Sequence, residues 1–346
     1  MNVFMVETPH QLLNAIEAKN RFPRKDNHLV VVLSDEYTVR AYEPLINAGE
    51  WTRVHYVESK TDPRRGLGKW LKRHPSARIR GYYMIYELSL LRKNLTEIGR
   101  SLIRADDVFL GNYSVDYMRH FSNIIEHDTL YLLDDGTSTI FINKARKEAF
   151  QEGFKDSVIN AITGLKTGQS EQVTFFTTYD LDVKQGDSLV KNDYRYLREL
   201  AASATRTDEI YFLGMTLIVE GLSRERYMEY LRKVLKYFCD EKIVYVPHKL
   251  EPPDKVEYIR DQMGLTVRKF PVPIEYQLTM GGTVPKMLAS FCCSALENCR
   301  VIFGPELPIK SFYIDPEHCP HLSEFVSDIY CYFESKSSPH FEVVRL

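Results

Sequence analysis

Short, almost purely apolar stretches alternate with helical stretches along this chain. Residues 28–33 (HLVVVL) are apolar at nearly every position, a pattern typical of a parallel strand that is covered on both faces. Residues 11–21, just before them, place their apolar side chains on one side of a helix. Because strands that alternate with helices form parallel sheets, the sequence predicts an α/β fold.

The alternation occurs twice, which predicts two Rossmann-like domains. Strands are expected at residues 2–7, 28–33, 54–57, 107–111, 129–133 and 173–177, and again at 209–213, 242–246, 265–270, 287–291 and 300–303, with a long helix at 224–240. The segment 168–208 between the two runs is polar and weakly periodic. At 346 residues the chain also exceeds the size of a single hydrophobic core. We expect domains at 1–185 and 205–346, with parallel sheets facing an interdomain cleft, and leave open whether the last helix returns to the first domain.

Composition narrows the class of partner. The net charge is −2, so the chain has no overall basic field that would hold a nucleic acid. The first residues, MNVFMVETPHQLL, lack a basic region followed by an apolar run, and no apolar run approaches the length of a membrane span. We therefore expect a cytoplasmic protein, or one on the cytoplasmic face of the inner membrane, and leave open a homodimer.

The cysteine pattern does not predict a metal site. All six cysteines fall in the second half and none forms a CxxC pair: Cys239, Cys292, Cys293, Cys299, Cys319 and Cys331. A zinc site or a disulfide framework would need other spacings. We expect reduced thiols, buried for the most part, and no metal.

Two adjacent carboxylates form the first candidate cluster. Asp134 and Asp135 end an apolar strand, and Gly136 then turns the chain into an expected helix. Ligands of open α/β sheets bind beyond the carboxyl ends of strands, and successive side chains point to opposite sides, so only one of the two can face the cleft. That carboxylate could accept a proton from a hydroxyl group. The structural alternative is an ordinary Asp-Gly turn.

Three further clusters follow expected strands of the second domain. Pro247, His248 and Lys249 place an imidazole beside an ammonium, which suits a phosphate, although an ordinary surface loop has the same composition. Cys293 and Ser294 open an expected helix, where free N–H groups bind anions and where Ser294 could also serve as the N-cap. The fourth cluster is Gly214, Met215 and Thr216, in which the glycine permits close approach of the backbone to a ligand.

Taken in order, these residues resemble a known family. The segment Thr8-Pro9-His10-Gln11-Leu12-Leu13-Asn14-Ala15-Ile16-Glu17-Ala18, Asp134-Asp135-Gly136, the Gly214 turn, Pro247-His248, Pro273-Ile274-Glu275 and the serine-containing turn at 290–296 follow one another along most of the chain. This order is similar to that of the bacterial lipooligosaccharide sialyltransferases of glycosyltransferase family 52 and the related bacterial polysialyltransferases. The pairing of Asp-Asp-Gly with Pro-His is its most specific part.

The resemblance implies a metal-independent, inverting enzyme of the GT-B fold. Its donor would be a CMP-activated nonulosonic acid, its acceptor a glycan such as lipooligosaccharide or capsule, and it would need no cofactor. Asp135 would be the general base, and His248 would face the donor phosphate as general acid or charge stabiliser. The remaining donor-binding residues would be Gly214, Met215, Thr216, Pro247, Lys249, Glu275, Cys293 and Ser294, and the acceptor-side residues Thr8, Pro9, His10, Gln11, Asp134 and Gly136.

Two departures from the family pattern bear on the donor. The family's His-Pro is His248-Lys249 here, and its Ser-Ser/Thr pair is Cys293-Ser294. A transferase that uses a UDP- or GDP-sugar is the first alternative, with Lys249 and Lys286 as cations for a diphosphate. An inactive nucleotide-sugar-binding protein of the same outline is the second.

Two other signals are weaker. Asp180-Leu181-Asp182 has the spacing of a metal-binding DxD motif, but such a spacing arises by chance in a chain rich in aspartate. The basic segment 64–80, which carries Trp70, could touch anionic lipid or an anionic acceptor, or could be a solvated helix face.

Overall fold

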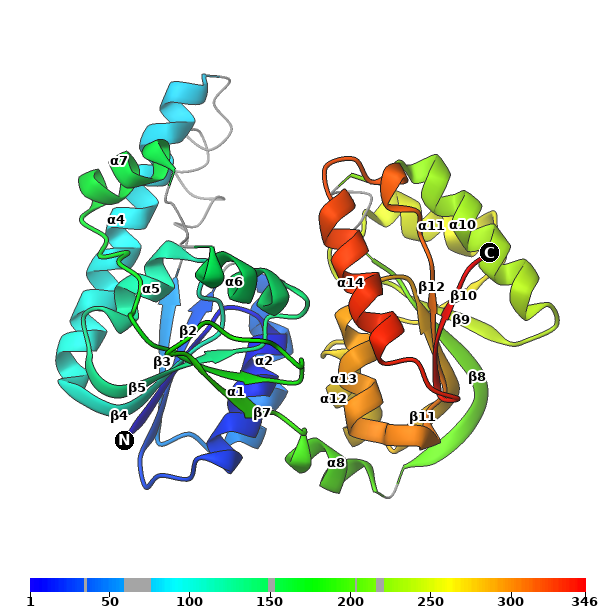
Figure 1. Cartoon of the computed structure of the whole chain (residues 1–346), viewed down its shortest axis with the longest axis horizontal. Helices are drawn as coiled ribbons and strands as arrows, with labels where there is room; N and C mark the ends of the chain where they lie inside the picture. Colours follow the sequence, from blue (N-terminus) through cyan, green and yellow to red (C-terminus); the bar gives the residue numbers. More distant parts are fainter. Residues whose placement is uncertain (34–35, 59–75, 149–152, 203, 216–220) are drawn as a thin grey trace. The chain divides into compact units, whose positions relative to one another are not determined.

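The computed structural model describes residues 1–33, 36–58, 76–148, 153–202, 204–215 and 221–346 (Figure 1). Within these ranges it leaves out the side chains of residues 36–41, 77, 78, 80, 154 and 155. The chain divides into two compact units, Met1–Asn192 and Asp193–Leu346. This division falls between the two domain ranges expected from the sequence.

The first unit contains a parallel sheet of seven strands in the order β3-β2-β1-β4-β5-β6-β7. The strands are β1 Asn2–Val6, β2 Asn27–Leu33, β3 Arg53–Glu58, β4 Arg104–Leu110, β5 Glu126–Leu133, β6 Thr174–Thr177 and β7 Ser188–Lys191. Its helices are α1 Pro9–Arg21, α2 Glu36–Gly49, α4 Ala77–Leu102, α5 Asp116–Ser122, α6 Ser138–Lys147 and α7 Phe154–Thr163. The strand order reverses between β1 and β4, and the crevice at such a point is where ligands of open α/β sheets bind.

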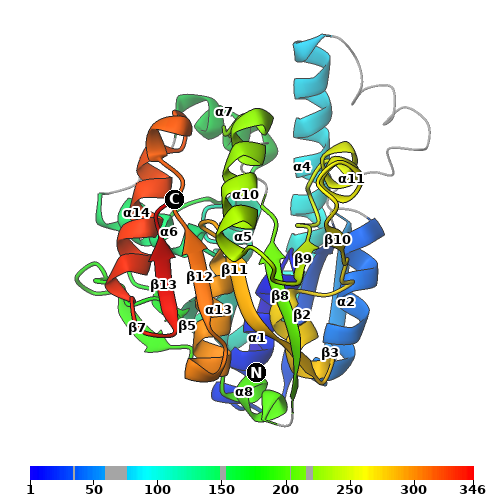
Figure 2. The same cartoon turned by 90° about the vertical axis from the view of Figure 1, so that its right-hand side faces the viewer.

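The second unit contains a parallel sheet of six strands in the order β10-β9-β8-β11-β12-β13, and its switch point lies between β8 and β11 (Figure 2). The strands are β8 Thr205–Leu213, β9 Ile243–Val246, β10 Thr266–Val267, β11 Thr283–Ser290, β12 Ile309–Phe312 and β13 Phe341–Val344. The helices are α8 Arg195–Ala201, α10 Arg224–Phe238, α11 Pro253–Asp261, α12 Ile274–Met280, α13 Ser294–Phe303 and α14 Ser323–Ser335, with short 3₁₀ turns η1 Gly304–Glu306 and η2 Pro316–His318. The last helix, α14, contacts β13 and η2 of its own unit.

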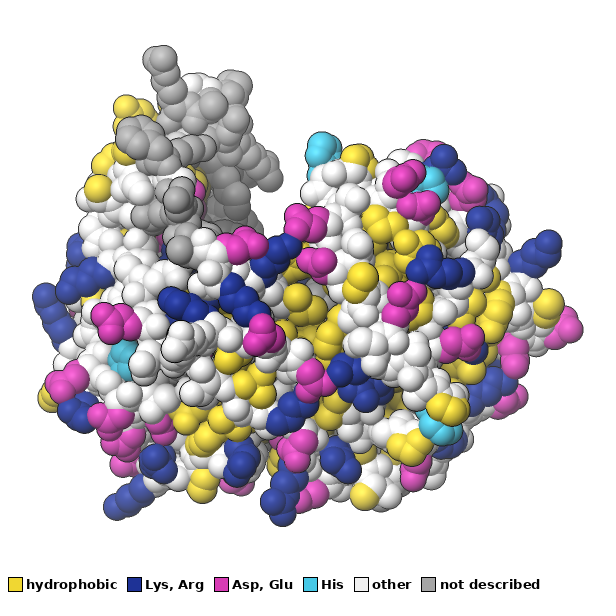
Figure 3. Space-filling view, in the orientation of Figure 1, with side chains coloured by type: hydrophobic (Ala, Val, Ile, Leu, Met, Phe, Trp, Pro, Cys, Tyr) yellow, Lys and Arg dark blue, Asp and Glu magenta, His cyan; other side chains and the backbone are white. Residues whose placement is uncertain are grey.

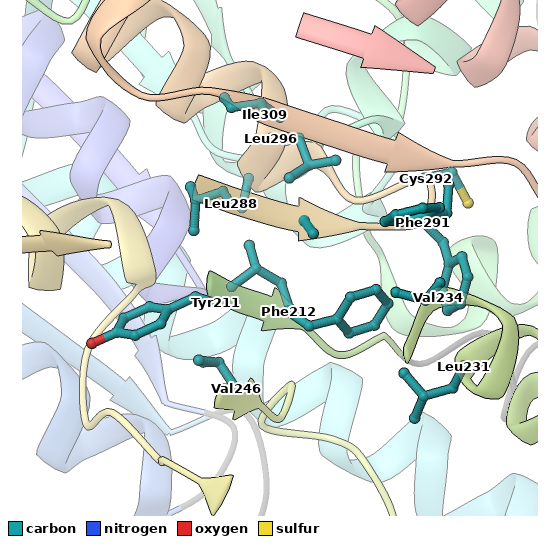
Figure 4. Close-up of a cluster of buried hydrophobic side chains, with 14 of the residues drawn as sticks. Tyr211, Phe212, Leu231, Val234, Val246, Leu288, Phe291, Cys292, Leu296 and Ile309 are labelled. Atoms are coloured by element: carbon teal, nitrogen blue, oxygen red, sulfur yellow. The ribbon is translucent and has the colours of Figure 1, made fainter. Parts of the chain in front are cut away.

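Each sheet is buried by aromatic and aliphatic side chains. In the first unit Phe109 stacks on Phe4 at 4.4 Å and on Tyr131 at 4.6 Å between ring centroids. In the second, Phe291 meets Phe212 edge-on at 5.2 Å, within the cluster of buried side chains drawn in Figure 4. These contacts hold the strand ends of each unit in fixed register, and the loops that follow them are correspondingly constrained.

One expected strand is wrong and three strands were not expected. Residues 300–303 (RVIF) form the last turn of α13, because Leu296, Cys299 and Ile302 recur at helical spacing and are all buried. The strand that follows is β12, and β7 and β13 were also missed. Each of these three strands has four residues and contains a charged side chain (SLVK, IKSF, FEVV), so each lacks the unbroken apolar run that identifies β9 (IVYV), a strand of the same length.

All six cysteines are free thiols, two of which, Cys239 and Cys331, are exposed. Among the described residues, no helix combines the length and the apolar character that crossing a membrane requires. On the face drawn in Figure 3, Lys and Arg side chains are interspersed with Asp and Glu.

Candidate active site

The first candidate region is the carboxyl-terminal edge of the sheet in the first unit. β1, β4 and β5 are neighbours there, so the loops that follow them meet. Asn14, in α1, donates a hydrogen bond from Nδ2 to the backbone carbonyl of Asp134 at 2.9 Å. Helix α1, which follows β1, is thus in direct contact with the Asp-Asp-Gly turn after β5, more than a hundred positions away in the sequence.

Asp134 is completely buried in the first unit. Its Oδ2 accepts hydrogen bonds from the backbone N–H of Thr178 at 2.7 Å and from the Thr178 hydroxyl at 3.2 Å. Burial raises the pKa of Asp134, while hydrogen bonds from Thr177, Thr178 and Thr139 oppose that rise. The carboxylate therefore ties the end of β5 to the loop after β6.

Asp135 differs from its neighbour by being only partly buried. Its Oδ2 accepts a hydrogen bond from Asn112 Nδ2 at 2.6 Å, and its backbone N–H donates to Thr139 Oγ1 at 3.2 Å. Gly136 follows with φ of 62°, a left-handed conformation that glycine adopts without strain, and α6 begins two residues later. The two adjacent carboxylates thus differ in burial, since Asp134 is enclosed and Asp135 is partly exposed.

The Thr8–Gln11 turn is held mainly by its own hydrogen bonds. Thr8 is the N-cap of α1 and accepts from the backbone N–H of Gln11 at 3.2 Å, and Pro9 occupies the first helical position. Gln11 is buried, and its Oε1 accepts from the Glu7 backbone N–H at 2.8 Å. His10 is partly buried and its Nε2 lies 3.2 Å from Asn14 Nδ2. Thr8, Pro9 and Gln11 therefore have structural roles in the turn, whereas the ring of His10 contacts Asn14.

The second candidate region is the carboxyl-terminal edge of the sheet in the second unit. β9, β8 and β11 are adjacent, so the loops that begin at Gly214, Pro247 and Phe291 lie at one edge. Ser290 Oγ donates to the Leu213 carbonyl at 2.7 Å, which joins the ends of β11 and β8. Met215 is described, whereas Thr216 lies outside the described residues.

His248 is held by hydrogen bonds on two sides. Its backbone N–H donates to Glu251 Oε2 at 3.0 Å, and its Nδ1 accepts from the Leu250 backbone N–H at 3.2 Å. Although the residue is exposed, protein atoms around the ring lower the pKa of His248, and the positive charges of Lys249 and Lys255 lower it further. With Nδ1 as acceptor, the neutral ring carries its proton on Nε2, where it can donate a hydrogen bond.

A buried charged network, which the sequence did not predict, lies beneath this loop. Glu251 Oε1 accepts from Tyr245 OH at 2.6 Å and is also ion-paired with Lys255, and the two charged side chains are 0% and 1% exposed. Lys255 Nζ donates to the Met215 carbonyl at 3.3 Å and lies 3.3 Å from the ring centroid of Tyr227. Burial lowers the pKa of Lys255 to about 8 in spite of its carboxylate partner.

The buried charged network explains why position 214 is a glycine. A Cβ atom at that position would lie 2.3 Å from Glu251 Oε2 and 2.5 Å from Tyr245 OH. The glycine therefore makes room for protein atoms beneath the loop, whereas the sequence suggested close approach to a ligand.

The predicted helix start after β11 is one residue out. Cys293, rather than Ser294, is the N-cap of α13, and its side chain makes no capping hydrogen bond. Burial raises the pKa of the Cys293 thiol to about 11, so the thiol is neutral. Ser294 is the first helical residue and is partly exposed. Glu275, in α12, is buried and accepts from Asn298 Nδ2 at 2.8 Å, so it contacts α13.

The structure describes one of the two weaker sequence signals, the DxD spacing, in full and the other, the basic segment, only in part. Asp182 accepts from Lys147 at 2.6 Å and Asp180 is ion-paired with Lys191, so both carboxylates of the DxD spacing have cationic partners. The described residues contain no group of three His, Cys, Asp or Glu side chains arranged to hold a metal ion. Most of the basic segment, residues 64–75, lies outside the described residues.

Comparisons with known proteins identify a fold and no closer kinship. No family model matches the chain, and no curated protein matches it. Among solved structures, the chain is similar to a protein of Listeria monocytogenes assigned as a UDP-N-acetylglucosamine 2-epimerase, with a TM-score of 0.53, 9% identity, and coverage of 99% of this chain and 92% of that one. It is also similar to Arabidopsis thaliana UGT89C1 complexed with UDP (TM-score 0.48, 12% identity, 95% and 82% coverage) and to Escherichia coli heptosyltransferase WaaC with ADP (0.40, 10%, 96% and 99%).

The two parallel sheets and the likeness to the Listeria monocytogenes structure confirm the expected fold class. The chain has the GT-B fold, with one parallel sheet in each of two α/β units. At such low identity the fold alone is shown, so the chemistry must be argued from the two sheet edges.

Proposed function

We propose that the protein is an inverting glycosyltransferase that moves a nonulosonic acid from a CMP-activated donor to a hydroxyl of a glycan such as lipooligosaccharide or capsule. The observation that carries this proposal is Asp135, a partly exposed carboxylate at the end of β5 with one oxygen fixed by Asn112. The proposal makes the first unit the acceptor-binding domain and the second unit the donor-binding domain. Its place of action is the cytoplasm or the cytoplasmic face of the inner membrane.

In this reaction Asp135 acts as the general base. It accepts the proton of the acceptor hydroxyl while that oxygen forms a bond to the anomeric carbon from the face opposite the phosphate. The bond from the anomeric carbon to the phosphate oxygen breaks at the same time, and CMP leaves with the electron pair. The hydrogen bond from Asn112 fixes the carboxylate's orientation before the acceptor binds, and such positioning lowers the barrier.

His248 serves the leaving group. The neutral ring presents Nε2–H, and a hydrogen bond from it to a phosphate oxygen becomes stronger as CMP gains charge. Bound phosphate would also raise the pKa of His248, because a nearby negative charge favours the imidazolium. Lys249 and the start of α13, with Cys293 and Ser294, are the further groups that we propose for the same phosphate.

The placement of the lysines supports a donor with a single phosphate. Lys286 is the second lysine that the sequence suggested for a diphosphate. It lies in β11, away from the carboxyl-terminal end of the strand, and donates to Asp208 at 3.0 Å and also to Glu241. Lys255 is occupied by Glu251 and the Met215 carbonyl. That leaves Lys249 as the exposed lysine of the His248 loop.

The proposal is tested with nucleotides and sugar donors on the full chain. We expect CMP to bind in the presence of a chelator, and Asp135→Asn to keep CMP affinity and folding while transfer falls by about a hundredfold or more. Asp128→Asn, an exposed change elsewhere on the same strand, is the matched control and should transfer normally. Binding of UDP or GDP but not CMP would move the donor to the alternative class. Unimpaired transfer by Asp135→Asn would refute the role of the base, and sugar epimerisation without transfer would refute the reaction.

A further inference from the structure

A cavity of about 340 Å³ lies in the first unit beside the start of α5. Its walls come from α4, the loop after β4, α5 and α7: Leu88, Ser114, Val115, Asp116, Tyr117, Arg119 and Asp156. Neither the sequence nor the comparisons point to these residues. The volume is at the lower end of the range for small-ligand pockets, about 300–1,000 Å³, and suits a group of the size of one sugar.

Hydrogen bonds connect the cavity wall to the proposed base. Ser114 donates to Asn112 Oδ1 from its backbone N–H at 2.9 Å and from its hydroxyl at 2.5 Å. The other end of the same amide, Nδ2, donates to Asp135 at 2.6 Å. The Tyr117 hydroxyl donates a hydrogen bond to the carboxylate of Glu7, which immediately precedes Thr8, the N-cap of α1. Asn112 is thus hydrogen-bonded both to Ser114 of the cavity wall and to Asp135.

The charges of the cavity disfavour an anionic ligand. Its one lysine or arginine, Arg119, is fully engaged: the guanidinium donates to the carbonyls of Tyr113, Ser114 and Thr167 and is ion-paired with Asp116. Asp156, in α7, is an exposed carboxylate of the cavity wall. Burial raises the pKa of Tyr117, and the negative charges of Glu7, to which it is hydrogen-bonded, and of Asp135 raise it further. A carboxylate or phosphate in the cavity would thus find negative charge, and among the residues that line it no available cation.

The remaining surface suits a pyranose ring. Leu88, Val115 and the ring of Tyr117 offer apolar contact, and Ser114 and Asp156 offer polar atoms. A sugar presents C–H groups on the faces of its ring and hydroxyls around its edge, so it matches a wall that is partly aromatic and partly hydrogen-bonding.

We propose that this cavity binds an uncharged sugar unit of the acceptor and presents its hydroxyl towards Asp135. The role of the cavity as an acceptor site rests on the proposed transferase function. Sugar binding to the cavity, however, needs neither the donor nor catalysis and can be measured without them. It makes the protein selective for acceptors that end in a neutral sugar over acceptors that end in a carboxylated one.

Two variants and a control probe the cavity. Leu88→Trp fills it from α4, at a partly exposed position outside the main hydrophobic cluster. Asp156→Lys replaces the exposed carboxylate with a cation. Val158→Trp adds the same indole to the same helix as Asp156, at a position that is 41% exposed and does not line the cavity.

Saturation-transfer NMR on the full chain, without nucleotide, measures binding of methyl β-galactoside, methyl β-glucoside, methyl N-acetyl-β-glucosaminide and the methyl glycoside of N-acetylneuraminic acid. We expect wild type and Val158→Trp to bind at least one of the neutral probes, and Leu88→Trp to bind it at least about tenfold more weakly. We expect the carboxylated probe to bind more weakly than the neutral ones to wild type, and Asp156→Lys to reduce that difference. Failure of every neutral probe to bind, equal binding by Leu88→Trp, or preference of wild type for the carboxylated probe would overturn the assignment.

CMP affinity of the same preparations separates this proposal from the donor chemistry. Leu88→Trp should bind CMP as wild type does, because the cavity lies in the first unit and the proposed phosphate groups in the second. Sugar binding that depends on Leu88 in a protein that binds no CMP would support the cavity and refute the CMP-dependent function. CMP binding without any sugar in the cavity would do the reverse.

Discussion

The buried pair of Glu251 and Lys255 makes a pH-dependent prediction that a single substitution tests. Glu251→Gln keeps the shape of the side chain but removes the negative charge beside an ammonium that is 1% exposed. Without its partner Lys255 loses its proton on folding, because an unpaired charge in the interior costs several kcal/mol. In wild type the pKa of Lys255 is about 8, so below that pH the folded protein keeps the proton.

The magnitude follows from proton linkage. Below pH 8 the unfolded chain and folded wild type both hold the Lys255 proton, since an ordinary lysine titrates near 10.4, and the folded variant does not. The free energy of unfolding of the variant therefore rises with pH by about 1.4 kcal/mol per unit in this window, relative to wild type. The destabilisation caused by Glu251→Gln should be about 3 kcal/mol larger at pH 6 than at pH 8 and constant above pH 8.

Urea denaturation of the full chain at pH 6, 7, 8 and 9 measures this difference. Circular dichroism is the readout because both tryptophans, Trp51 and Trp70, belong to the first unit and would not report on the second. Two controls isolate the pair. Glu251→Gln combined with Lys255→Met removes the titrating group and should abolish the slope, and Glu97→Gln breaks the exposed i,i+4 pair with Lys93 and should have little effect at any pH. A destabilisation that is the same at pH 6 and pH 9 would refute the charged pairing of Lys255.

Three further predictions concern single side chains. Asp134→Asn should lower the free energy of unfolding by about 1–3 kcal/mol, because it changes the buried carboxylate whose Oδ2 accepts the hydrogen bond from the Thr178 backbone. Thermal melting measures this loss, and an unchanged melting temperature would contradict the role of Asp134 in holding the loop. His248→Ala should melt within a few degrees of wild type yet transfer sugar about a hundredfold more slowly, and near-normal transfer would make the histidine an ordinary loop residue. Burial lowers the pKa of His120 to about 4, so this residue should make wild type lose stability as the pH falls from 6.5 towards 4, and His120→Gln should lose less stability than wild type over that range in urea titrations.

Much of the fold was predictable because several of its strands are nearly unbroken apolar runs. Residues 28–33 could be identified as a buried parallel strand from six consecutive positions, and β2 spans Asn27–Leu33. The stretch 300–303 misled because a run of arginine, valine, isoleucine and phenylalanine looks the same in a strand as on the buried side of a helix. Only its spacing from Leu296 distinguishes the two, and that requires knowing where α13 begins.

The loops of the candidate site could be predicted for a similar reason. Their polar residues follow apolar strands directly, and the carboxyl ends of parallel strands meet at one edge. The residues that hold those loops could not. Lys255 lies beyond two prolines, Pro252 and Pro253, and Tyr245 stands inside a strand where an aromatic side chain is expected to be core. Because lysines are almost never wholly buried, a lysine in a sequence is predicted to lie at the surface.

Both sheet edges hold the side chains that we propose as functional in the same way. In the first unit the buried carboxylate of Asp134 accepts a backbone N–H from Thr178, and the neighbouring Asp135 is left partly exposed. In the second, the buried carboxylate of Glu251 accepts the backbone N–H of His248, whose ring is left exposed. In each unit a buried carboxylate fixes the loop, so the side chain that we propose as functional needs no packing of its own. Since both members of each set are polar residues beside a strand end, the sequence marks the loop, and only burial distinguishes the residue that holds it from the residue proposed to react.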